Sequence, residues 1–193
     1  MESASDRELI IQIQQGSLDA LGIIYDRHNR LVYRTALAIC NDQEAASDLL
    51  QDAFLRLYRF AGRVDPERPL EPWLYRVTAN LSYSWVKRQH RWTRPLEEIA
   101  EWFSGGRKQS PQNIVEMDEE SNRIQQAIAS LPLPQRVVVA LYYINDLSLQ
   151  EIAAILEIPE GTVKSRLHYG RAGLRRQFGL TNEAIPDVQY EFT

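Results

Sequence analysis

The stretch that decides the fold is SLQEIAAILEIPEGTVKSRLHYGRAGL, which runs from Ser148 to Leu174. Ser148 and Glu151 have the S-x-x-E spacing of a capping box, which predicts the start of a helix at this point. Pro159 interrupts the run of helix-forming residues and suits the first turn of a following helix. The stretch therefore predicts a short helix, a tight turn and a second helix, which is the helix-turn-helix arrangement.

The second predicted helix has two chemically different faces. Apolar or small residues recur at helical spacing along one side, at Val163, Leu167, Gly170 and Leu174. The polar residues that lie opposite or beside this stripe are Lys164, Ser165, Arg166, His168, Tyr169 and Arg171. A basic outer face on such a helix is typical of DNA binding in the major groove. Because amphipathic helices joined by a proline turn also occur in domains that bind nothing, this pattern alone leaves both interpretations open.

The overall charge does not suggest a nucleic-acid partner, but the charges are segregated along the chain. The 193 residues have a net charge of −4. Residues 72–96 contain five cations and no acid, whereas residues 97–120 contain seven acids and two cations. The chain opens on polar and acidic residues, and no apolar run approaches the roughly 20 residues of a membrane span. We therefore expect a cytoplasmic protein that is not inserted into a membrane.

Helical periodicity dominates the remaining sequence and strand signals are scarce, which predicts an all-α fold. Residues 44–60 form a strongly amphipathic segment, with Leu49, Ala53 and Phe54 on its apolar side. A loop rich in proline follows at 61–72, and then a long helix that mixes cations with aromatic residues. We expect two small helical domains, at 1–95 and 122–178, joined by a flexible acidic linker at 96–121. The tail at 179–193 shows no periodicity.

The sequence has few features that are typical of an enzyme active site. His28, His90 and His168 lie far apart in the sequence, and the chain contains no H-E-x-x-H, no glycine-rich phosphate loop and no C-x-x-C motif. The single cysteine, Cys40, lies in an apolar run and is expected in the core. We therefore expect neither catalysis nor a bound metal or cofactor.

Three segments together resemble the extracytoplasmic-function group of bacterial sigma-70-type factors. Residues 148–166 are similar to the core of the family's fourth conserved region, S-x-x-E-I-A-x-x-L-x-x-P-x-G-T-V-K-S-R. Residues 48–54 resemble the D-x-x-Q-[DE]-x-F pattern of the polymerase-binding part of the second region. Residues 73–80 carry the W-L-x-R pattern and the asparagine of the promoter-melting part. Among departures, Ser84 stands where the family often has aspartate, and Tyr169-Gly170 where it favours Arg-Ala.

The resemblance implies a function and assigns residues to it. The chain would direct core RNA polymerase to promoter DNA, and an anti-sigma factor would be a further partner. The residues implied in core polymerase binding are Asp48, Gln51, Asp52 and Arg56. Those implied in binding the −10 promoter element are Arg63, Arg76, Asn80, Tyr83, Lys87 and Arg88. The polar face of the helix-turn-helix would bind the −35 element.

The alternative is an autonomous regulator, in which the helix-turn-helix binds DNA unaided and the first domain senses a ligand or dimerises. Such a protein needs neither the polar face at residues 48–56 nor the basic aromatic helix. Tight promoter binding in the absence of polymerase would favour this alternative.

Overall fold

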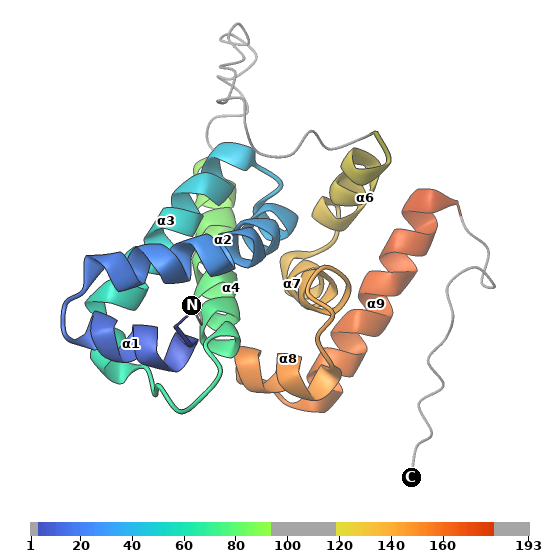
Figure 1. The fold of residues 1–193 in the computed structure, drawn as a ribbon. Helices are drawn as coiled ribbons and strands as arrows, with labels where there is room; N and C mark the ends of the chain where they lie inside the picture. The colour runs from blue at the N-terminus through green and yellow to red at the C-terminus, as the bar shows by residue number, and fades with distance from the viewer. Residues whose placement is uncertain (1–3, 94–118, 180–193) are drawn as a thin grey trace, which may run out of the picture.

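The computed structural model describes residues 4–93 and 119–179, and within these ranges every regular element is a helix, as the sequence predicted. The N-terminal group comprises α1 (Asp6–Gln14), α2 (Leu18–Cys40), α3 (Gln43–Arg59), the 3-10 turn η1 (Ala61–Arg63) and α4 (Glu71–Thr93). The C-terminal group comprises α6 (Glu119–Ala129), α7 (Leu133–Tyr143), α8 (Leu149–Leu156) and α9 (Glu160–Phe178). Figure 1 shows the two groups side by side.

Side chains that accept hydrogen bonds from the backbone determine where the N-terminal helices begin. Ser5 and Glu8 form a capping box at α1, and the Ser17 hydroxyl accepts from the Ala20 amide at 3.2 Å to start α2. The Asp42 carboxylate accepts from the Ala45 amide at 2.8 Å and starts α3. These caps satisfy amide groups that have no partner within the helix itself.

The core of the N-terminal group forms where α2 packs against α1, α3 and α4. Ile24 and Val32 of α2, Leu57 of α3 and Leu74 of α4 are completely buried. Cys40 belongs to this core, as the sequence predicted, and burial raises the pKa of its thiol to about 11.

In the C-terminal group, α7 is the central helix and contacts α6, α8 and α9. Two glycines allow α9 to lie unusually close to its neighbours. A Cβ atom built on Gly170 would come within 2.6 Å of Val139 Cγ2, and one built on Gly173 within 2.5 Å of Leu131 Cδ2. The apolar side predicted for this helix is confirmed, because Val163, Leu167 and Gly170 are all buried.

The two groups of helices also pack against each other, through contacts of α2 with α6 and α7 and of α4 with α7 and α8. Polar side chains bridge this boundary. The Arg136 guanidinium donates to the Ile39 carbonyl at 2.9 Å, and the Asn145 amide donates to the Thr35 hydroxyl at 2.9 Å. The α2 helix therefore contributes to the core of its own group and also supports the other group.

The expected linker and tail lie largely outside the described residues, which exclude 94–118 and 180–193. Helix α6 begins at Glu119, slightly before the expected domain start at residue 122. None of the described helices is both long and apolar enough to cross a membrane.

The contact at Gly170 leads to a first prediction. Gly170→Ala should lower the free energy of unfolding by about 1–3 kcal/mol, because the added methyl group overlaps Val139. Gly161→Ala is the matched control on the same helix, since a Cβ there meets no atom within 4 Å. Alanine's higher helix propensity should leave that variant unchanged or stabilise it by up to about 1 kcal/mol. Urea denaturation measures both, and equal effects would contradict the close packing of α9 on α7.

Candidate nucleic-acid interface

The helix-turn-helix predicted from the sequence is present. The Ser148 hydroxyl accepts from the Glu151 amide at 3.3 Å, and the Glu151 carboxylate accepts from the Ser148 amide at 2.8 Å, so the capping box is confirmed. Hydrogen bonds from the Ser148 side chain and backbone hold the pKa of Glu151 below its usual value. Helix α8 ends at Leu156, and the capping residue Glu157 adopts the left-handed conformation with φ of 55°. Pro159 then precedes α9.

The outer face of α9 presents five of the six residues expected to contact −35 DNA. Ser165, His168 and Tyr169 are exposed, and Tyr169 leaves 61% of its surface open to solvent. Lys164 and Arg166 are partly exposed. The Lys164 amine lies 3.1 Å from the Glu160 carboxylate one turn earlier. This face therefore combines cations, hydroxyl groups and an imidazole on the side of α9 that is turned away from the core.

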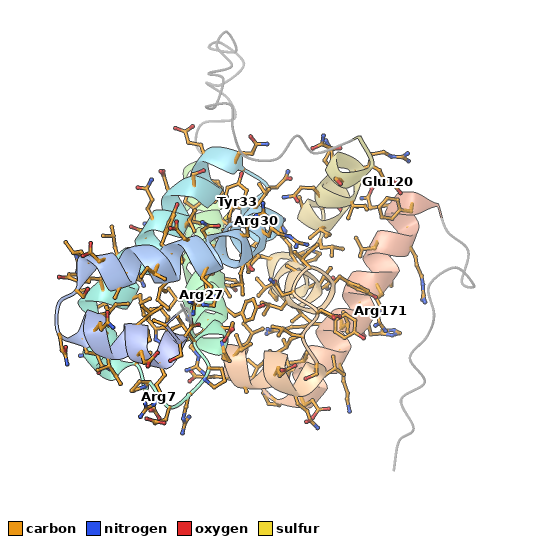
Figure 2. The ribbon with its side chains drawn as sticks, in the orientation of Figure 1. Arg7, Arg27, Arg30, Tyr33, Glu120 and Arg171 are labelled. Carbon is orange, nitrogen blue, oxygen red and sulfur yellow. The ribbon has the colours of Figure 1, made fainter. Side chains whose placement is uncertain are left out.

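Arg171 corrects the sequence-based expectation, because the structure buries it. Figure 2 labels Arg171 between α9 and α7, and only 6% of the residue is exposed. Its Nε atom donates to the Tyr143 hydroxyl at 2.8 Å, and its guanidinium lies 5.2 Å from the centre of the Tyr142 ring. A side chain held by two aromatic rings cannot also reach a DNA phosphate, so its role in this structure is to fasten α9 to α7.

Helix α4 places several of the expected −10 residues on one surface. Asn80, Tyr83 and Lys87 recur at helical spacing, with Asn80 and Lys87 exposed and Tyr83 half-buried. The Lys87 amine lies 4.9 Å from the centre of the Tyr83 ring. Arg88 follows and is exposed, while Arg63 on η1 is exposed beside the ring of Phe60.

Arg76, also expected to bind −10 DNA, contacts α8 in this structure. Its Nε atom donates to the Ile155 carbonyl at 3.1 Å, and its terminal nitrogens donate to the Ala154 carbonyl at 2.9 Å and the Glu157 carboxylate at 2.7 Å. The carbonyl groups at the end of a helix lack partners within the helix and attract cations. Arg76 thus caps the first helix of the helix-turn-helix from across the boundary between the two groups.

A cavity of about 480 Å³ lies between the loop that follows η1 and helix α8. Its lining comes from both groups and includes Arg63, Arg68 and Trp73 on one side and Glu151 and Ile155 on the other. Part of the surface expected to receive −10 DNA therefore faces α8 in this arrangement.

Helix α3 presents the four polar residues Asp48, Gln51, Asp52 and Arg56 to solvent, on the side predicted from the sequence. The structure adds a residue that sequence analysis missed. Leu55 lies on the same face and exposes 58% of its surface. Helical periodicity could have predicted that Leu55 is exposed, because Leu55 does not fall on the apolar side of the helix that Ala53, Phe54 and Leu57 form. A single exposed leucine is common on protein surfaces, but Leu55 lies within the polar face of α3 and can supply it with an apolar contact.

Comparisons with known proteins agree with this arrangement. Residues 24–92 match the family model of sigma-70 region 2, and residues 121–174 match that of sigma-70 region 4. The ECF RNA polymerase sigma factor SigW of Bacillus subtilis is 34% identical over 180 residues, which cover 89% of this chain and 95% of that protein. SigM of Mycobacterium tuberculosis is 30% identical, with 94% of this chain and 88% of that protein covered.

Solved structures show a similar fold. CnrH, determined in complex with the cytosolic domain of CnrY, has a TM-score of 0.64 at 24% identity, covering 90% of this chain and 97% of that chain. RpoE of Bartonella quintana, determined with the anti-sigma factor NepR, has a TM-score of 0.60 at 21% identity, covering 78% of this chain and 91% of that chain.

The placement of Arg171 gives a second prediction. Arg171→Ala should lower the free energy of unfolding by about 1–3 kcal/mol, because it removes a partly buried hydrogen bond and the aromatic contacts. Arg176→Ala is the matched control, since Arg176 is exposed on the same helix and should change stability by less than about 0.5 kcal/mol. Thermal and urea unfolding followed by circular dichroism make the comparison. Equal stability of the two variants would show that Arg171 is a surface residue after all.

Proposed function

This chain belongs to the extracytoplasmic-function subfamily of sigma-70-type RNA polymerase sigma factors, and from that premise we propose how its surfaces divide the task of promoter recognition. The observation that carries the proposal is the distribution of three chemically distinct surfaces over two groups of helices. Helix α3 offers a mixed polar and apolar face, α4 a cationic and aromatic face, and α9 a polar face on a helix-turn-helix.

The α3 face binds core RNA polymerase. Asp48, Gln51, Asp52 and Arg56 supply charge and hydrogen-bonding groups, and Leu55 supplies an apolar contact at their centre. A small apolar centre within a polar rim is the usual composition of a specific protein interface. Because these side chains point away from the core, they are free to specify a partner without any effect on the fold.

The surface formed by η1, the following loop and α4 binds the −10 element as its strands separate. Cations such as Arg63, Lys87 and Arg88 suit the phosphates, while the aromatic ring of Tyr83 offers a stacking surface for an unpaired base. Arg76 reaches DNA only after its hydrogen bonds to α8 are broken. Its participation therefore requires the two groups of helices to separate at this point.

The outer face of α9 reads the −35 element in the major groove. Ser165, His168 and Tyr169 are the candidates for contact with base edges, because they are exposed on the side of α9 away from α7. Lys164 and Arg166 are candidates for contact with phosphates or bases at the edge of this face. Tethering two modest DNA-binding surfaces in one chain raises the effective concentration of the second once the first is bound.

The proposal also includes the compartment in which the chain acts and the partners that it meets there. The chain acts in the cytoplasm, where it meets polymerase and promoter DNA, and it contributes binding and positioning to a reaction that the polymerase catalyses. An anti-sigma factor restrains it, as the complex of RpoE with NepR suggests by analogy. An autonomous helix-turn-helix regulator is the weaker alternative, because it gives no role to the face of α3.

A reconstituted transcription assay tests the proposal. Asp52→Ala and Gln51→Ala should each reduce specific run-off transcripts made with purified core enzyme, in proportion to a loss of core binding. Both residues are exposed, so stability should change by less than about 0.5 kcal/mol. Asp26→Ala, at an exposed position of α2, is the matched control and should transcribe like the wild type.

Two results would contradict the proposal. The first is sequence-specific promoter binding by the chain alone with no core-dependent transcripts, which would indicate an autonomous regulator. The second is a large loss of helicity in Asp52→Ala, which would show that this residue supports the fold instead of a partner.

A further inference from the structure

Three side chains with metal-binding groups meet where α4, the helix proposed to contact −10 DNA, begins. Asp6 in the first turn of α1, His28 in the middle of α2 and Glu71 in the first turn of α4 each offer one possible ligand atom. These donor atoms lie within 4.8 Å of one another. The described helices contain no second group of this kind. Helices α1 and α4 both pack against α2 (Figure 1), and three residues distant in the sequence come together between them.

The central member of this group is a buried imidazole. His28 is 6% exposed, and its Nε2 atom lies 2.7 Å from Asp6 Oδ2. The Glu71 carboxylate is half-buried, and within the described part of the chain it has no hydrogen-bond or ion-pair partner. A half-buried carboxylate without such a partner keeps an uncompensated negative charge beside Asp6 and His28, and a bound cation would neutralise it.

A neighbouring arginine orients the group in the manner of an outer coordination shell. The Arg27 guanidinium binds Asp6 Oδ1 and also donates to the Ala4 carbonyl at 2.9 Å. This contact fixes the Asp6 carboxylate and leaves Oδ2 directed at His28. The cluster then holds two carboxylates, one guanidinium and one imidazole. When the imidazole is neutral, these groups together have a net charge of about −1.

We propose that Asp6, His28 and Glu71 bind a divalent first-row transition ion of the zinc, cobalt or nickel type. One imidazole nitrogen and two carboxylate oxygens are the mixed ligand set that such ions accept, and a water molecule completes the shell. Bonds of about 2.0–2.2 Å to each donor require small shifts. Asp6 and His28 move slightly apart, Glu71 moves inward, and the ion replaces the Asp6–His28 hydrogen bond.

Binding also sets the protonation state of the histidine. The ion takes the lone pair of Nε2, so the imidazole must be neutral with its proton on Nδ1. The bound ion would link α1 and α2 to the first residue of α4, next to Pro72 and Trp73, which line the cavity facing α8. The site thus stabilises the N-terminal group and fixes the start of the helix proposed to contact −10 DNA.

Metal titrations of the full chain, stripped with a chelator, test this site. Isothermal titration calorimetry with zinc should show one site per chain, and zinc should raise the melting temperature while magnesium, which disfavours imidazole, should not. Glu71→Gln and His28→Gln should weaken zinc binding by at least about tenfold. Glu44→Gln, at an exposed position of α3, and His168→Gln, at an exposed position of α9, are the matched controls and should bind like the wild type.

Cobalt gives an independent readout, because its visible d–d absorption bands report the coordination geometry of the bound ion and should be lost in His28→Gln. Because His28 is buried, His28→Gln can lose binding through misfolding. Glu71→Gln tests the site independently, since Glu71 is only half-buried and glutamine has nearly the same shape. Absence of zinc binding in the wild-type chain would overturn the proposal. So would binding that survives unchanged in both Glu71→Gln and His28→Gln, because the ion would then lie elsewhere.

Discussion

The close approach of α9 to α7 is the constraint on which the helix-turn-helix depends. Gly170 and Gly173 have no side chain because Val139 and Leu131 occupy the space that a Cβ would need. Arg171 lies between these two glycines and fastens the same side of α9 to the aromatic residues of α7. Once that side is fixed, the opposite side must face solvent. The identity of the DNA-reading face therefore follows from packing on the other side of the helix.

Two arginines connect the two groups of helices by donating hydrogen bonds to backbone carbonyls across the boundary. Arg136 donates to the Ile39 carbonyl near the end of α2 and to the Leu131 carbonyl, and burial lowers the pKa of its guanidinium. Arg76 donates to carbonyls at the end of α8. In both cases a cation satisfies backbone acceptors that a helix end leaves without partners. Arg76 is the informative residue, because the same side chain is proposed to bind DNA and cannot reach DNA while it donates to α8.

The sequence predicted features that depend on local spacing. The Ser148 capping box, the exposed side of α3 and the apolar stripe of α9 all follow from helical periodicity and were present in the structure. The contacts made by Arg171 and Arg76 could not be predicted because their partners are distant in the sequence, at Tyr143 and at the end of α8. Periodicity gives the direction of a side chain around its own helix but contains nothing about which other helix lies in that direction. For the same reason, the sequence could not predict that the Asp6, His28 and Glu71 side chains, which come from three helices, lie close together.

The central claim is that two surfaces of one chain bind separate elements of one promoter once core polymerase is present. DNA-cleaving reagents tethered to cysteines introduced as Ser84→Cys on α4 and Gly161→Cys on α9 test it directly, since both positions are exposed. Cys40 should remain unlabelled, because it is buried and its pKa is about 11. We expect each reagent to cut its own region of the promoter, and only with core enzyme. Cleavage at one shared position, or the same pattern without core enzyme, would contradict the claim.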